Sequence, residues 1–201
     1  MPNLVLPICY FPPISFWQHA IKANEVLLDS HEFYIKQTYR SRCKIYSVHG
    51  PQVLTIPLDK ASSKTLMNTA ELVEYEPWRK VHLKALEAAY SASPFFEFYI
   101  DELKPILFGN QKRLVEFNLA GINWINKVLD LDIQFTQTVD FQKEYPFQDL
   151  RPGKKNEFEP PANLPKYNQV FMDKGKSFVP NLSILVLLFN LGNEARVYLH
   201  G

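Results

Sequence analysis

Two short apolar runs near the N-terminus flank a segment that has the length of a helix. Residues 4–9 are apolar on both faces, as in a strand buried inside a sheet, and residues 25–29 have the same character. Between them a pair of prolines interrupts the chain, and Ser15 is predicted to cap a helix over residues 16–23. A strand, a helix and a second strand in this order favour a parallel pair joined by a right-handed crossover. We therefore expect the fold to begin with a βαβ unit.

A hairpin is predicted further along the chain. Residues 42–48 and 52–58 are rich in β-forming residues, with Cys43 and Ile45 on one face and Lys44 on the other. A Gly-containing link joins the two runs, which is typical of antiparallel strands. Together with the βαβ unit, the hairpin predicts a mixed sheet.

The middle of the chain is predicted to be helical. Apolar residues fall at helical spacing over residues 78–90, then in a second helix whose apolar stripe includes Phe98, and most clearly over residues 114–128. Gly121 lies within the last stripe, so this helix face is expected to approach another backbone closely.

The C-terminal half is predicted to hold a further strand, a proline-rich excursion and a buried helix. The strand covers residues 133–139, and residues 145–165 contain five of the chain's 15 prolines. That density argues for a stretch without regular structure, either an insert or a loop over a site. A helix over residues 182–190 is apolar all round and is expected to be buried. The whole chain, residues 1–201, is therefore interpreted as one α/β domain with a mixed sheet, a βαβ unit, an antiparallel hairpin and a helical middle section.

The charge, the apolar runs and the cysteines argue against several partners and cellular compartments. The net charge is +1, so no global field would attract nucleic acid or an anionic membrane. The longest apolar run, residues 184–189, is too short to insert into a membrane, and the first residues lack the pattern of a signal peptide. Cys9 and Cys43 lie in predicted strands or strand ends and fit reduced thiols. We expect a cytoplasmic protein, and no pattern indicates its oligomeric state.

The motifs of several common active sites are absent from the sequence. The five histidines are scattered without the spacing of metal ligands, so no metal site is predicted. The seven glycines form neither a phosphate-binding loop nor a Gly-x-Ser-x-Gly turn. These absences argue against P-loop, dinucleotide-dependent and α/β-hydrolase chemistry, and no cofactor is indicated.

The densest polar cluster of the chain runs from residue 29 to residue 44, directly after a predicted buried strand. Lys36, Arg40 and Arg42 supply cations that suit phosphate groups, and Tyr39 supplies a flat face for a base or a sugar ring. Open α/β sheets place their ligand crevices at such strand ends. The other interpretation, a solvated loop and strand face, remains open because basic residues are common on such surfaces.

Acid–base chemistry and ring binding are assigned to further residues. His31 or Glu32 would manage protons beside the phosphate grip, and Tyr10 would line the cleft after the first strand. Trp78 and His82 share one helix face, so that His82 would present a nitrogen to a ligand stacked on Trp78. For this pair the alternative is a core tryptophan and a core histidine bonded to the backbone.

Four segments, in this order, resemble the WbqC-like protein family in the form common in Bacteroidetes. They are LPICYFPPI at residues 6–14, HEFYIKQTYRSRC at 31–43 continuing to LTIP at 54–57, Trp78 and His82 with SPFF at 93–96, and YNQVF at 167–171 with PNLSI at 180–184. The family is named from O-antigen and related polysaccharide loci, so the resemblance implies work on sugars or nucleotide sugars. Relatives outside this branch carry His-Gln-Pro where residues 7–9 read Pro-Ile-Cys, so no histidine there is available for a mechanism.

The leading hypothesis is an enzyme of bacterial surface-polysaccharide biosynthesis that modifies a nucleotide-linked sugar, by group transfer to an amino or hydroxyl position. Its partner would be that small-molecule substrate, with no nucleic acid. The alternative is a non-catalytic binding or assembly protein of the same pathway. A third reading is a small-molecule binder with the proline-rich segment as a lid.

Overall fold

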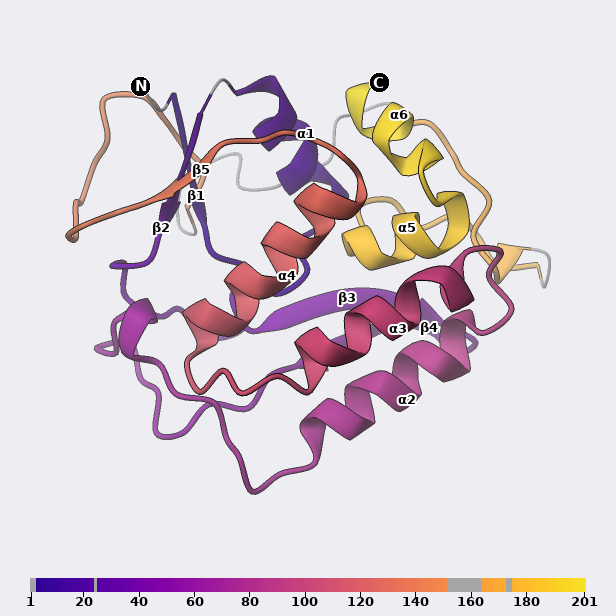
Figure 1. Cartoon of the computed structure of the whole chain (residues 1–201), viewed down its shortest axis with the longest axis horizontal. Helices are drawn as coiled ribbons and strands as arrows, with labels where there is room; N and C mark the ends of the chain where they lie inside the picture. Colours follow the sequence, from indigo (N-terminus) through magenta and orange to yellow (C-terminus); the bar gives the residue numbers. More distant parts are fainter. Residues whose placement is uncertain (1–2, 24, 152–163, 173–174) are drawn as a thin grey trace.

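A parallel sheet forms one end of the fold (Figure 1). The computed structural model describes residues 3–23, 25–151, 164–172 and 175–201, and within these the sheet has the order β5-β2-β1-β6 with every neighbouring pair parallel. Its strands are β1 (Leu4–Pro7), β2 (Val26–Asp29), β5 (Phe135–Gln137) and β6 (Gln148–Asp149). Helix α1 (Ile14–Lys22) joins β1 to β2. The predicted βαβ unit is confirmed.

The start of α1 differs from the prediction. Ser15 lies inside the helix, and the residue before its first turn is Pro13, which has no side chain that could cap it. The backbone N–H of Ser15 instead donates to Oδ1 of Asn181 at 2.9 Å, from a segment 166 residues away in the chain. The cap prediction for Ser15 was wrong because the partner of that helix end is tertiary rather than local.

The predicted hairpin is confirmed as β3 (Arg42–Ser47) and β4 (Gly50–Thr55), with Arg42 opposite Thr55 and Ser47 opposite Gly50. It forms a two-stranded sheet of its own instead of extending the parallel one. Helices from the middle and the C-terminal part pack on β3 (Figure 1). The α/β class is therefore confirmed, with parallel and antiparallel pairing divided between two sheets.

The helical middle is also confirmed, as α2 (Trp78–Tyr90), α3 (Phe96–Leu107) and α4 (Leu114–Val128), preceded by a short 3-10 helix, η1 (Met67–Thr69). The apolar face of α3 matches the prediction only in part. Leu103 is buried as expected, but Phe98 is 73% exposed, and the other buried positions are Phe96, Ile100 and Leu107. Because the helix begins at Phe96, the positions that face the core recur at helical spacing from that residue.

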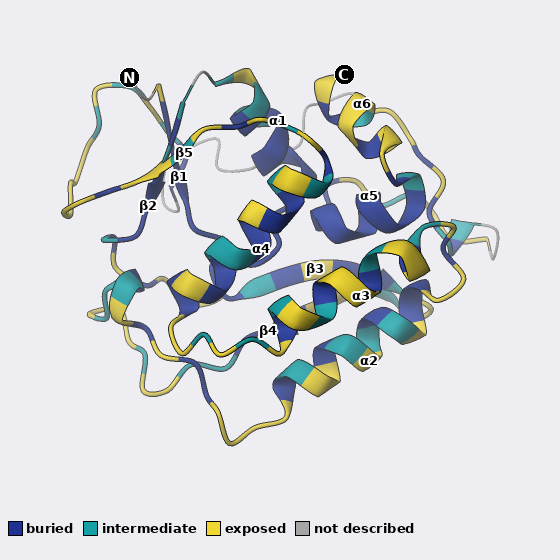
Figure 2. Ribbon diagram, in the orientation of Figure 1, coloured by how far each residue is buried: buried dark blue, intermediate teal, exposed yellow. Residues whose placement is uncertain are grey.

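The core is deepest where α5 (Ile184–Leu191) passes between the other helices and β3 (Figure 2). Its residues from Ile184 to Asn190 are all buried, as predicted. Gly121 on α4 does lie in a close contact, because an added Cβ would come within 2.9 Å of the Phe11 ring, a side chain rather than a backbone. A last helix, α6 (Glu194–His200), was not predicted and packs against α1 and α5.

The proline-rich excursion, residues 145–165, is only partly described. Its first part contains β6, so that part has regular structure, whereas residues 152–163 lie outside the described residues. The division of the chain into a single domain stays a prediction. None of the helices described is both long and apolar enough to cross a membrane.

Candidate active site at the carboxyl edge of the parallel sheet

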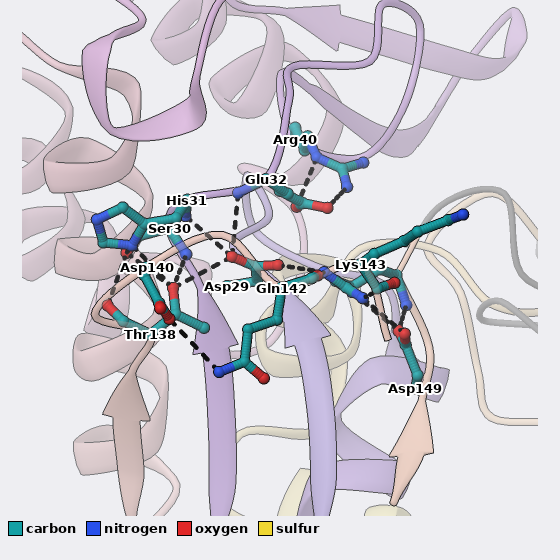
Figure 3. Close-up of polar contacts among 11 residues, drawn as sticks. Asp29, Ser30, His31, Glu32, Arg40, Thr138, Asp140, Gln142, Lys143 and Asp149 are labelled. Carbon is teal, nitrogen blue, oxygen red and sulfur yellow. Dashed lines mark hydrogen bonds and ion pairs between the residues drawn. The ribbon is translucent and has the colours of Figure 1, made fainter. Parts of the chain in front are cut away.

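Polar residues gather where the four parallel strands end. Because neighbouring strands are parallel, their carboxyl ends share one edge, which is where open α/β sheets place ligand crevices. Asp29 closes β2 and is followed by Ser30 and His31, and Thr138 follows β5 on the neighbouring strand (Figure 3). Arg151 follows β6 on the far side of β1. We call these residues the edge network.

Asp29 is the centre of the edge network. It is fully buried, and each hydrogen-bond partner of its two carboxylate oxygens is a donor (Figure 3). Oδ1 accepts the backbone N–H groups of His31 at 2.9 Å and Glu32 at 3.0 Å, and the Thr138 hydroxyl at 3.1 Å. Oδ2 accepts from Nη1 of Arg151 at 2.6 Å. This pattern is that of an ionised carboxylate, which can accept but not donate.

Arg151 ties the ends of the sheet together. The Arg151 guanidinium reaches past the end of β1 to pair with Asp29, because β1 lies between β6 and β2. It also donates to Asp149 and to the carbonyl groups of Gln142 and Lys143, so each of its five N–H groups has a partner. Burial disfavours the charge, but the bonds to Asp149 and Asp29 outweigh it and raise the pKa of Arg151. Its role is a structural clamp rather than a ligand contact.

His31 is the half-buried member of the edge network. Its Nδ1 lies 3.0 Å from Oγ of Ser30 and 3.0 Å from Oγ1 of Thr138. Figure 3 shows the second ring nitrogen pointing away from these partners. Within the described part of the chain, Nδ1 is the only hydrogen-bonded atom of that ring, and Nε2 has no partner there.

Glu32 and Arg40 are paired with each other, and not arranged around a phosphate as predicted. Arg40 is fully buried, and its Nε donates to Oε1 of Glu32 at 2.8 Å while Nη2 donates to Oε2. Nη1 donates to Oγ1 of Thr38 at 3.3 Å. Burial raises the pKa of the Glu32 carboxyl to about 7, although the Arg40 guanidinium pulls it down. The Arg40 guanidinium therefore faces a protein carboxylate and not the surface.

A shallow pocket of about 250 Å³ lies beside this pair. It is lined by Gln37, Thr38, Tyr39, Arg42, Lys44 and Val53. None of the lining residues that the structure describes is acidic, and the Lys44 ammonium lies 5.4 Å from the centre of the Tyr39 ring. The structure thus places Tyr39 and Arg42 together, and separates Arg42 from the buried Arg40. Lys36 is exposed and is not one of the lining residues.

The remaining candidates, Tyr10, Trp78 and His82, are all buried, and the His82 ring contacts both of the other rings. The Tyr10 hydroxyl lies 2.8 Å from Nδ1 of His82, whose other polar partner is the backbone of Thr55. Trp78 donates its indole N–H to the carbonyl of Val73 at 2.9 Å. Burial, opposed by the bond to Thr55, lowers the pKa of His82 to about 4. These contacts are those of a neutral histidine inside the core.

Acidification is expected to destabilise the protein through His82. Its pKa is lowered from 6.5 to about 4 in the folded state, so unfolding takes up a proton between these values. The stability that depends on the neutral ring is present above pH 6.5 and is lost as the pH falls toward 4, by about 3 kcal/mol in all. Urea unfolding of the wild type and of His82→Gln, measured at pH 7 and pH 4.5, isolates this loss as a difference. The prediction fails if the two proteins lose stability in parallel.

Two members of the edge network were missed by the sequence interpretation. Thr138 fell inside a predicted strand, and Arg151 fell in the proline-rich stretch. The available signal for Thr138 was its place next to the last residue of the predicted strand, because polar side chains converge at the strand ends of parallel sheets. Arg151 gave no local signal. Among the described residues, no group of three or more His, Cys, Asp and Glu side chains is placed to hold a metal ion.

Comparison with known proteins agrees with the sequence resemblance. A model of the WbqC-like protein family matches residues 9–151, more than half of the chain, and this range includes every residue of the edge network. The chain belongs to the WbqC-like protein family. It is also similar to "Uncharacterized protein Rv1507c" of Mycobacterium tuberculosis (strain ATCC 25618 / H37Rv), with 26% identity over 223 residues that cover 94% of this chain and 91% of the relative. No solved structure matches the chain.

Proposed function

We propose that the protein is an enzyme of bacterial surface-polysaccharide biosynthesis that acts on a nucleotide-linked sugar. The proposed reaction transfers a group from an activated donor to a hydroxyl or amino position of the sugar. In this step the sugar oxygen or nitrogen forms the new bond, the donor's leaving group departs with its electron pair, and the released proton passes to His31. Membership of the WbqC-like family supports the pathway.

The observation that carries the proposal is the basic pocket beside Glu32 and Arg40. Arg42 and Lys44 supply two cations, and no acidic side chain is among the described residues of the lining, which suits a diphosphate. The ring of Tyr39 supplies a flat face for a base or a sugar. A guanidinium fork and an aromatic face in one pocket match the two chemical halves of a nucleotide sugar.

Direct contacts connect this pocket to the edge network. Thr38 lines the pocket and accepts from Arg40, and Arg40 pairs with the Glu32 carboxylate. The backbone N–H of Glu32 then donates to Asp29. A ligand held in the pocket therefore lies against the loop that also carries His31, the acid–base candidate whose Nε2 has no hydrogen-bond partner among the described residues.

Isothermal titration of the wild type with a panel of UDP-linked and dTDP-linked sugars tests the proposal. At least one sugar is expected to bind, and Arg42→Ala is expected to weaken it by about tenfold or more, as loss of a charge-assisted hydrogen bond does. Lys44→Ala should weaken it less, because an ammonium makes no bidentate contact. Lys84→Ala removes an equal charge from the exposed side of α2 and is the matched control.

The proposal fails if no nucleotide sugar binds the wild type, or if Arg42→Ala and Lys84→Ala bind equally well. Affinity that falls with added salt in the wild type, and less steeply in Arg42→Ala, would support a phosphate contact over a sugar contact.

The alternative, a non-catalytic binding or assembly protein of the same pathway, is favoured by a different surface. A groove of about 490 Å³ at the start of α3 is lined by four apolar or aromatic residues and three polar ones: Phe95, Phe98, Tyr99, Leu191, Glu102, Asn193 and Glu194. Phe98 is 73% exposed and its ring lies beside that of Phe95, so the groove presents grouped apolar side chains rather than a single exposed one. Failure of every nucleotide sugar to bind would favour this second function.

A further inference from the structure

His31 has one ring nitrogen inside the edge network and one outside it. In a neutral imidazole one nitrogen carries the proton and the other offers a lone pair, and the hydrogen bonds around the ring decide which is which. Here Nδ1 meets two hydroxyl groups, of Ser30 and Thr138, each at 3.0 Å. The protons of these two hydroxyls therefore determine the chemistry of Nε2.

The Thr138 hydroxyl has no proton to give to His31. Its single proton is donated to the Asp29 carboxylate, 3.1 Å away. The other hydrogen bonds of that carboxylate come from N–H donors. The same oxygen accepts the backbone N–H of Ser30 at 3.1 Å. The contact between Thr138 Oγ1 and His31 Nδ1 is thus a hydrogen bond only when Nδ1 is protonated and donates.

The Ser30 hydroxyl, which also lies 3.3 Å from Oγ1 of Thr138, allows a competing arrangement. Its hydroxyl could donate to Nδ1, which would move the ring proton to Nε2 and leave Nδ1 facing Thr138 Oγ1 at 3.0 Å with no proton between them. When Ser30 donates instead to the Thr138 carbonyl at 3.5 Å, the Nδ1 proton serves both of its contacts. Two facing lone pairs in a partly buried site cost more than one long hydrogen bond.

We infer that Thr138 and Asp29 hold His31 as the Nδ1–H tautomer, so that Nε2 accepts a proton from a hydroxyl or amino group of a bound ligand. The ligand's O–H or N–H bond breaks, its electron pair stays on the ligand atom, and the proton joins the Nε2 lone pair. The Nδ1–H bond to Thr138 is the same before and after, so the edge network needs no rearrangement. His31 is then a catalytic residue and Thr138 a positioning residue.

The identity of the ligand rests on the proposed function, in which the group belongs to the sugar. The tautomer does not rest on it, because the tautomer follows from contacts within the chain. The two inferences can therefore fail separately.

Long-range ¹H–¹⁵N correlation spectra of ¹⁵N-labelled protein, recorded at a pH where the ring is neutral, test the inference directly. His31→Gln identifies the resonance. We expect the Nδ1–H form to exceed the Nε2–H form by about fivefold or more, the ratio that one hydrogen bond supports. Thr138→Ser and Ser30→Ala should keep this tautomer, since each leaves an acceptor hydroxyl. Thr138→Val should reverse it, because Ser30 is then free to donate to Nδ1.

A wild-type ring in the Nε2–H form overturns the inference, whatever the variants show. A Thr138→Val protein that folds and keeps the Nδ1–H form removes Thr138 from the positioning role and overturns it as well. A wild type that shows the Nδ1–H form but binds no nucleotide sugar refutes the proposed function and leaves the tautomer standing. A bound nucleotide sugar that shifts the Nε2 resonance of the wild type supports both.

Discussion

Replacing Asp29 by alanine is expected to lower the free energy of unfolding by about 3–5 kcal/mol, the cost of leaving a buried charge without its partner. The carboxylate is fully buried and accepts from Arg151, from Thr138 and from two backbone N–H groups. Without it, the Arg151 guanidinium keeps Asp149 but loses its bond across the end of β1. The loss is measured by urea unfolding at pH 7.5 with the midpoint and slope fitted together.

Two controls separate this effect from a general loss of charge. Asp101→Ala removes a carboxylate of α3 whose side chain is 81% exposed and whose partner, Lys104, is three residues away, so the midpoint should hardly move. Asp29→Asn keeps an oxygen that accepts from the backbone while removing the charge, and should fall between the two. A loss below about 1 kcal/mol in Asp29→Ala would show that the carboxylate is no more than an ordinary surface partner.

The local parts of this site could be read from the sequence, and the long-range parts could not. The strand that ends at Asp29 and the polar cluster after it follow from a short apolar run and the residues next to it. The contacts that complete the network join Asp29 to Thr138 over 109 residues and to Arg151 over 122 residues. They depend on β5 and β6 joining the sheet beside β2 and β1. Two-residue β6 has no pattern of its own.

Arg40 and Arg42 show that contacts between residues closer together in the sequence are also missed by a reading of local pattern. Both were predicted to face a phosphate, because each stands in one basic stretch of the sequence. Arg40 lies just before β3, where Nδ2 of Asn118 on α4 holds its carbonyl at 2.7 Å and its side chain turns inward to Glu32. Arg42 is the first residue of β3 and lines the pocket. The tertiary contacts of Arg40 with Asn118 and Glu32, which a basic stretch of sequence does not reveal, distinguish the two positions.

The pairing of Glu32 with Arg40 leads to the second large effect, which a double-mutant cycle measures. Arg40→Met leaves the Glu32 carboxylate buried without its cation and should cost about 3–5 kcal/mol, and Glu32→Leu should cost as much by stranding Arg40. The double variant replaces both charges by apolar groups and should be far more stable than the sum of the single losses predicts. Additive losses would mean that the two side chains do not depend on each other.

The cycle also has a pH dependence with a definite sign. The pKa of Glu32 is already raised to about 7 by burial, and removing Arg40 takes away the group that pulls it down. A raised folded-state pKa gives stability that is present at low pH and is lost as the pH rises through it. Arg40→Met should therefore be more destabilising at pH 8, where an ionised Glu32 must stay buried, than at pH 6, where the carboxyl can be neutral.

The same variants decide between the two roles of Arg40. If Arg40 only supports the loop through Glu32, the double variant should bind a nucleotide sugar about as well as the wild type, since Arg42 and Tyr39 still line the pocket. If Arg40 turns outward to bind phosphate, the double variant should lose about tenfold or more in affinity despite its stable fold. Because stability and affinity are measured on one protein, a folding defect cannot be mistaken for a lost phosphate contact. The buried ion pair predicts the first outcome.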